Sequence, residues 1–129
     1  MYADIGMSRK IPMAFLGGGM SRLLSIILAI AKVKNGIVLI DEVDAGIHYS
    51  HMPKVWEGIS KAAREFNCQI FATTHSYECL QAAYNGIAQA DMAREFRYTR
   101  LERDEQETIA QTYTHDVLGA AMSRGWEIR

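Results

Sequence analysis

The chain has 129 residues, 49% of them hydrophobic, which suits one domain with a substantial core and excludes a disordered chain. Lysine and arginine number 14 against 15 acidic residues, so the formal net charge of −1 gives no support for recruiting nucleic acid or an anionic membrane. The longest apolar run, residues 23–31, is too short for a membrane span, which needs ~20 residues.

Targeting signals and cysteine usage both favour the cytoplasm. Residues 1–19 contain a small charged cluster and then glycines, without the apolar core of a signal peptide. Cys68 and Cys79 fall in a predicted strand start and a predicted helix, which favours two buried thiols over a disulfide. We therefore expect one soluble cytoplasmic domain, residues 1–129.

A helix and a strand open the patterned part of the chain. Residues 23–34 are apolar on nearly all sides, so we expect a helix that is buried on every side. Asn35 and Gly36 end this helix, since both tolerate a positive φ. Residues 37–40 are β-branched or leucine throughout and predict a strand covered on both faces.

A second helix and a second strand follow. Residues 51–66 carry apolar side chains at helical spacing, with Ser50 as the expected cap. Residues 68–72 predict another buried strand, and Ser76 caps a third helix that ends near residue 84. Strand, helix and strand in this order predict a parallel crossover.

The last third of the chain has a different pattern. Residues 95–115 alternate apolar and polar side chains around a polar turn and predict an antiparallel hairpin. Residues 116–129 predict a short helix and a tail. The expected fold class is α/β, with a mixed sheet, flanking helices and a C-terminal antiparallel hairpin.

Polar clusters follow both predicted strands. Asp41, Glu42 and Asp44 come after the first strand, and His75 lies just after the second. Because ligands bind at the carboxyl ends of parallel strands, we expect Asp41, Glu42 and His75 to surround one crevice. Neighbouring carboxylates repel one another, so we expect a positive partner nearby, and a hydrated Mg²⁺ held by Asp41 would serve. Glu42 would then deprotonate a water, and His75 would bind a phosphate oxygen.

Four segments occur in a fixed order: residues 15–31 (FLGGGMSRLLSIILAIA), 36–42 (GIVLIDE), 43–48 (VDAGIH) and 70–76 (IFATTHS). Their order, spacing and strand context resemble the ABC-type ATPases, above all the soluble SMC-like, RecF-like and overcoming-lysogenization-defect group. In turn they look like the signature motif with its helix, the Walker B strand with its catalytic glutamate, the D-loop and the switch-histidine segment. The C-terminal tail also resembles that of small bacterial AAA-type ATPases of this group.

The resemblance implies ATP and Mg²⁺ as cofactors and assigns roles in ATP hydrolysis to three residues. Asp41 would hold Mg²⁺ through water, Glu42 would polarise the attacking water, and His75 would contact the γ-phosphate.

The resemblance also implies a dimer seam. Gly17, Gly18 and Gly19 would offer N–H groups at a helix N-terminus to the nucleotide of the opposite subunit, and Asp44 would lie at the same seam. Relatives usually have serine at the position of Gly17 and often proline at the position of Val43.

The family's phosphate-binding loop, G-x-x-x-x-G-K-[ST], has no match in these residues, because no glycine precedes a lysine. The resemblance therefore implies a partial P-loop-NTPase-like fold, the C-terminal lobe of an ABC-type ATPase without its P-loop half. That loop supplies the lysine and most of the N–H groups that hold the phosphates. One unit-charge repulsion at ~4 Å costs about 4 kcal/mol at an effective dielectric of 20. We predict weak or absent ATP binding and no turnover for the chain alone, and whether it is an enzyme stays open.

Plainer interpretations exist for each motif. The acidic cluster can be a solvated turn, His75 can cap a helix, and the glycines can be a flexible helix entry. His48 and His51 are spaced for a metal, but they straddle a helix start and lack further ligands. Arginines interleaved with aromatic residues in the hairpin suit a nucleic-acid surface, but neighbouring acids cancel their charge.

Three functions follow from these patterns. The leading one is an ATPase fragment that contributes the signature loop, Walker B carboxylates, D-loop and switch histidine to an ATP site. The alternative is a non-catalytic interaction or oligomerisation module, because sheet and helix faces left without the other half would associate. The third is a metal-dependent hydrolase that uses Asp41, Glu42 and His75. We expect a homo-oligomer or a complex with the missing N-terminal ATPase half, and no membrane partner.

Overall fold

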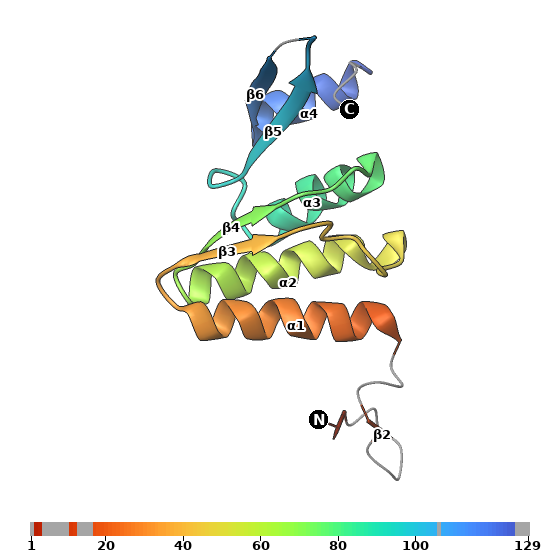
Figure 1. Cartoon of the computed structure of the whole chain (residues 1–129), viewed down its shortest axis with the longest axis vertical. Coiled ribbons are helices and arrows are strands. Elements are labelled where there is room, and N and C mark those ends of the chain that lie inside the picture. Colours follow the sequence, from red (N-terminus) through yellow and green to blue (C-terminus); the bar gives the residue numbers. More distant parts are fainter. Residues whose placement is uncertain (1, 4–10, 13–16, 106, 126–129) are drawn as a thin grey trace.

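A computed structural model describes residues 2–3, 11–12, 17–105 and 107–125 (Figure 1). Helices cover one face of a parallel pair of strands, and a hairpin with a final helix lies at the end of the molecule away from the first helix. None of the helices described is long and apolar enough to cross a membrane. The elements in chain order are β1 (Tyr2–Ala3), β2 (Ile11–Pro12), α1 (Gly18–Val33), β3 (Ile37–Ile40), η2 (Tyr49–His51), α2 (Met52–Glu65), β4 (Gln69–Ala72), α3 (Tyr77–Gln89), β5 (Arg97–Arg103), β6 (Thr108–Thr114) and α4 (His115–Ser123).

β3 and β4 form a parallel pair in which Ile40 is opposite Ala72. Parallel strands need a crossover connection, and α2 provides it. The Gln69 N–H donates to the Gly36 carbonyl at 2.8 Å, and the Thr73 N–H donates to the Ile40 carbonyl at 2.9 Å, so hydrogen bonds continue the ladder beyond both ends of the pair. The carboxyl ends of the two strands therefore lie side by side, as predicted.

The main core lies between one face of the β3–β4 pair and the helices α1, α2 and α3. Val38 and Ile40 are buried on this face because alternate side chains of a strand point to the same side. The apolar stripe predicted for the second helix is buried there as well. The buried members of this core are Ile26, Ile30, Val38, Ile40, Val43, Met52, Val55, Trp56, Ile59, Ala62, Cys79, Ala82, Ala83 and Ile87.

The opposite face of the β3–β4 pair is open, so the prediction that the first strand is covered on both faces is wrong, and so is the prediction that the second strand is buried. Ile37 is 57% exposed, Leu39 is 77% exposed and Phe71 is 53% exposed. A continuous apolar run does not reveal whether a second layer exists to cover it. Within the described part of the chain, α1, α2 and α3 pack on the other face, and α4 packs on the hairpin.

The prediction that the first helix is buried on every side is also wrong. In α1 only Ile26 and Ile30 are buried, whereas Met20, Leu28 and Val33 are between 41% and 48% exposed. α1 packs against α2 and β3 along one side. No other layer of the described chain covers the outer side of α1. The helix therefore carries apolar side chains on that side that have no packing partner within the described residues.

Most helix ends follow the sequence signals. Asn35 takes a φ of 61° after α1, and the Ser76 hydroxyl caps α3 by accepting from the Cys79 N–H at 3.1 Å. α3 is longer than predicted. Ser50 does not cap α2, because it lies inside η2, where its hydroxyl is 2.9 Å from Nδ1 of His48.

The C-terminal hairpin is confirmed, with Tyr98 of β5 opposite Tyr113 of β6, and so is the α/β fold class. In the described chain the hairpin forms a sheet of its own, separate from the parallel pair. Arg97 donates to main-chain carbonyls next to it, and Arg100 pairs with Glu102 at 2.6 Å. These local contacts favour a solvated hairpin face over a nucleic-acid surface.

The α2–α3 contact yields a stability prediction. A Cβ on Gly86 would clash with the Pro53 carbonyl oxygen and lie 2.8 Å from the Trp56 Cβ, so Gly86→Ala must push α3 away from α2. We expect a loss of about 1–3 kcal/mol in the free energy of unfolding, measured in urea. Gly58→Ala is the control, because a Cβ at Gly58 meets nothing within 4 Å. Greater helix propensity should leave that variant as stable as the wild type or up to about 1 kcal/mol more stable. Equal effects of the two substitutions would contradict the packing described.

Candidate functional site

The acidic turn, residues 41–44, leaves the carboxyl end of β3 and is held by the residue that follows β4. Glu42 has a φ of 46°, a left-handed conformation that is uncommon for a residue with a side chain. Its N–H donates to Thr73 Oγ1 at 2.9 Å, and the Val43 N–H donates to the Thr73 carbonyl at 3.0 Å. The Val43 side chain is fully buried, which anchors the turn in the core.

Two threonines bind the two aspartates of the turn. Thr73 Oγ1 donates to Asp41 Oδ1 at 2.5 Å, and Thr74 Oγ1 donates to Asp44 Oδ1 at 2.7 Å. The Thr73 hydroxyl therefore contacts Asp41 and Glu42 at the same time. In the sequence these threonines occur only as part of the segment that resembles the switch-histidine motif. The signal for a larger role is the strand register, which places Thr73 next to Asp41.

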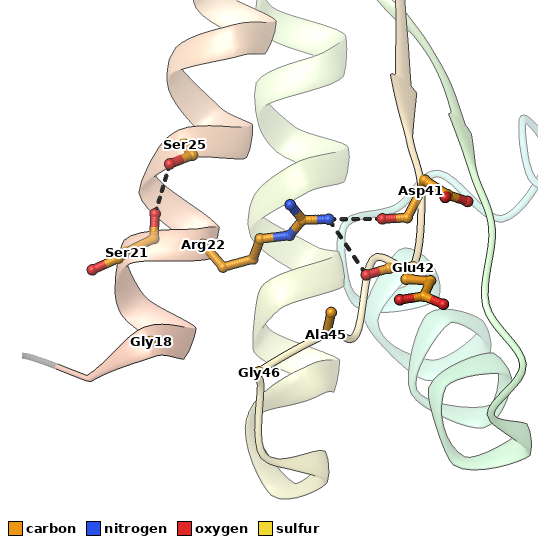
Figure 2. Close-up of a pocket in the computed structure, with 8 residues that line it drawn as sticks. All are labelled: Gly18, Ser21, Arg22, Ser25, Asp41, Glu42, Ala45 and Gly46. Atoms are coloured by element: carbon orange, nitrogen blue, oxygen red, sulfur yellow. Dashed lines mark hydrogen bonds between the residues drawn. The ribbon is translucent and has the colours of Figure 1, made fainter.

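Two hollows meet at Glu42 and Ala45, which line both of them. Of the residues predicted to surround one crevice, Asp41 lines the larger hollow and His75 lines the smaller one. The larger hollow, of about 480 Å³, is lined by Gly18, Ser21, Arg22, Ser25, Asp41, Glu42, Ala45 and Gly46 (Figure 2). The smaller hollow, of about 250 Å³, is lined by Glu42, Asp44, Ala45 and His75.

The glycine run, Gly17, Gly18 and Gly19, lies at the start of α1. Gly17 is the N-cap with a φ of 85°, and Gly18 begins the helix and lines the larger hollow. Gly19 rests on the loop after the acidic turn, because a Cβ there would be 3.0 Å from the Gly46 carbonyl oxygen. The structure thus brings the glycine run close to the acidic turn. Only Gly18 of the three lines the hollow between them.

Arg22 supplies a positive charge beside the acidic turn (Figure 2). Its Nη2 donates to the carbonyl oxygen of Asp41 at 2.7 Å and lies 3.4 Å from that of Glu42. The expectation of a positive partner is met by a residue that the sequence analysis did not single out. The one feature of the sequence that could have pointed to Arg22 is its position about one helical turn after Gly19. The contacts run to main-chain carbonyls, so they hold the turn in place.

The donor set suits a hydrated Mg²⁺ better than a metal held by several protein ligands. Asp41 offers a hard carboxylate oxygen, which Mg²⁺ prefers, and Mg²⁺ usually keeps several of its waters. The described residues contain no group of three or more His, Cys, Asp or Glu side chains that could hold a metal ion. His48 and His51 have ring centroids 6.2 Å apart, and His48 bonds Ser50, so nothing supports the zinc alternative.

Cys79 lies beneath the site and is 1% exposed. Burial raises the pKa of its thiol, and the negative charge of Asp44 acts in the same direction. The side chain is therefore a neutral thiol near pH 7, and it does not offer the thiolate that nucleophilic or metal chemistry needs. Both cysteines are free, as predicted, but only Cys79 is buried, whereas Cys68 is half-buried.

Comparison with known proteins relates the chain to ATPases. It is 30% identical over 107 residues to the ATP/GTP phosphatase of Helicobacter pylori (strain ATCC 700392 / 26695). The aligned segment covers 81% of this chain and 29% of that protein. It is 35% identical over 65 residues to the uncharacterized protein MJECL11 of Methanocaldococcus jannaschii, which covers 50% of this chain and 57% of that protein. The chain thus spans less than a third of the first relative and just over half of the second.

A solved structure described as "Structural biochemistry of ATP-driven dimerization and DNA stimulated activation of SMC ATPases" has the same fold. It matches with a TM-score of 0.61 over 95% of this chain and 70% of that chain, at 14% identity. Residues 4–80 match the family described as "AAA ATPase domain". That match covers more than half of the sequence, and the chain belongs to the AAA ATPase domain family.

Proposed function

We propose that this chain supplies part of the Mg-ATP site of an ABC/SMC-like ATPase and that a phosphate-binding loop from outside these residues completes the site. The observation that carries the proposal is the meeting of the acidic turn with Thr73 and Thr74 at the carboxyl ends of the parallel strands. Ligands of open α/β sheets bind at such ends. Membership of the AAA ATPase domain family and the SMC-like fold support the assignment.

Three residues would act on the nucleotide. Asp41 would hold Mg²⁺ through water, and Glu42 would polarise the attacking water as a general base. His75 would contact the γ-phosphate. The position of Glu42 between the two hollows supports this division, because of the two residues that line both hollows, Glu42 and Ala45, only Glu42 has a side chain that can accept a proton.

The glycine run and Asp44 would lie at a seam between two ATPase subunits. Gly17, Gly18 and Gly19 would offer N–H groups to a nucleotide held by the opposite subunit, as helix N-termini do for anions. The solved relative is described as undergoing ATP-driven dimerization, and we extend that behaviour to this chain. A cytoplasmic location is part of the same proposal.

The chain alone should bind Mg-ATP weakly and should not turn it over. The motif G-x-x-x-x-G-K-[ST] does not occur in the 129 residues, so the sequence contains neither the P-loop lysine nor its backbone cradle. Asp41 and Glu42 would then repel the triphosphate at close range. Arg22 reduces this repulsion only a little, because its guanidinium already donates hydrogen bonds to the carbonyl groups of the turn. Hydrolysis would therefore belong to the completed assembly.

Calorimetry and turnover assays test this function. Mg-ATP titrated into the chain alone should reveal no low-micromolar site. The chain joined to a P-loop-containing segment of a family member should bind Mg-ATP and hydrolyse it. In that joined protein, Glu42→Gln should keep binding and lower kcat by about 10²-fold or more, because it removes the proposed base.

Glu57→Gln is the matched control, since Glu57 lies on α2 and pairs with Lys54 and Lys61 away from the turn. It should leave turnover unchanged. Low-micromolar binding by the chain alone, or normal turnover by the Glu42→Gln protein, would contradict the assignment.

The second candidate is a non-catalytic interaction module, favoured by the open face of the β3–β4 pair. Ile37, Leu39 and Phe71 are more than half exposed there, and both strands of the pair have a free edge in the described chain. Exposed apolar side chains beside unpaired strand edges are usually resolved by association. We propose a homo-oligomer, or a complex with the N-terminal half of such an ATPase, as the state in which this face is covered.

Sedimentation at tens of micromolar tests the second candidate. The wild type should self-associate, and Leu39→Ser should shift the population toward monomer, because Leu39 is the most exposed of the three apolar side chains. Leu101→Ser is the control, since Leu101 is 69% exposed but lies on the hairpin. A wild-type protein that sediments as a clean monomer would argue against this candidate.

A further inference from the structure

We propose that Arg22 is a positioning residue, whose guanidinium holds the main chain of the acidic turn and ties that turn to the glycine-rich start of α1. The inference rests on the function proposed above, in which Glu42 acts on water and the glycine run contacts a nucleotide. Arg22 would act through two carbonyl groups rather than on the reacting atoms. Its contacts, its burial and its place on α1 each support this role.

The contacts of Arg22 are specific to the conformation of the turn. Nη2 lies 2.7 Å from the Asp41 carbonyl oxygen and 3.4 Å from the Glu42 carbonyl oxygen, so two successive carbonyls face one nitrogen (Figure 2). Successive peptide groups of an extended strand alternate in direction and would not converge in this way. The φ of 46° at Glu42 turns the chain out of the strand. A charged donor makes a stronger hydrogen bond to a carbonyl than a neutral donor does, so Arg22 stabilises a turn that is otherwise disfavoured.

The side chain of Arg22 is half-buried in the larger hollow. Its Nε is buried and has no hydrogen-bond partner among the described residues. An unmet buried donor costs free energy, so this arrangement needs compensation from the contacts that Nη2 makes. The two carbonyl groups of the turn therefore fix the position of the guanidinium, and the guanidinium in turn stabilises the conformation of the turn.

A second contact joins the same helix to the same loop. A Cβ on Gly19 would lie 3.0 Å from the Gly46 carbonyl oxygen and 3.4 Å from Ile47 Cα, which means that the first turn of α1 rests directly on the loop. Arg22 lies three residues further along and so projects from the same side of the helix. Because a helix is stiff, displacement of the glycine run would move both contacts and, through them, Glu42.

Thr73 holds the turn from the other side. It accepts from the Glu42 N–H and, through its carbonyl, from the Val43 N–H, whereas Arg22 binds the carbonyl groups. Loss of Arg22 would leave Thr73 as the polar partner of the Glu42 and Val43 amides. The Thr74–Asp44 contact and the hydrogen bond from the Ala45 N–H to the Glu42 carbonyl would also remain. The loosening should therefore be local, confined to the amides of Glu42 and Val43.

Amide hydrogen exchange of the full chain, followed by NMR, tests this role. Arg22→Met keeps an apolar stem and removes the donors, and it should accelerate exchange at Glu42 and Val43 by about tenfold or more. Exchange at Ile59 in the core of α2 should change by less than about twofold, because the global free energy of unfolding is little affected. Arg22→Lys restores a charged donor and should recover most of the protection.

Arg64→Met is the matched control, because Arg64 also donates to a main-chain carbonyl, that of Ala90 at 3.3 Å, away from the turn. It should leave exchange at Glu42 and Val43 unchanged. The proposal is wrong if Arg22→Met leaves the turn protected, or if it accelerates Ile59 equally. It is also wrong if Arg22→Lys is no better than Arg22→Met.

A turnover assay separates this inference from the proposed function. In the chain joined to a P-loop segment, Arg22→Met should lower kcat more than it raises KM, because it disturbs the placement of Glu42 rather than binding. Normal kcat in that variant would overturn the inference and leave the proposed function standing. Failure of the joined wild type to bind Mg-ATP would refute the proposed function, while the exchange data would still decide whether Arg22 holds the turn.

Discussion

The parallel register of β3 and β4 is the constraint on which the site and the core both depend. With Ile40 opposite Ala72, the chain next brings Asp41 beside Thr73, and hydrogen bonds continue across this junction. A slip of one residue would turn Val38 and Ile40 out of the core and separate Asp41 from Thr73. Core burial thus selects the register, and the register assembles the site.

The acidic turn shows how this fold accommodates carboxylates that repel one another. Thr73 and Thr74 donate hydroxyl groups to Asp41 and Asp44, and Arg22 places positive charge against the turn's carbonyls. Local rules for stability do not favour three acids within four positions in a left-handed turn. Proteins depart from these rules mainly at functional sites. Here α1, through Arg22, and the residues that follow β4 both hold the acidic turn in place. The proposed function uses this arrangement to bind a hydrated cation and a phosphate group.

Local patterns predicted much of this structure. The helix over Met52–Glu65 and the hairpin followed from side-chain periodicity, and the strand at Ile37–Ile40 followed from its continuous apolar run. The acidic turn followed from its place after that strand. The exposure of Leu39 and Leu28 could not be predicted, because an apolar side chain does not reveal whether another layer covers it. The contacts of Thr73 and Arg22, and the separation of Asp41 from His75 into two hollows, depend on register and side-chain direction in three dimensions.

Scalar couplings across hydrogen bonds, measured by NMR on the isotopically labelled chain, test the register most directly. The account predicts a correlation between the Val43 N–H and the Thr73 carbonyl and another between the Thr73 N–H and the Ile40 carbonyl. Both together would establish that the acidic turn lies against the end of β4. A folded chain whose correlations report a register shifted by even one residue would contradict the assembly of the site described here.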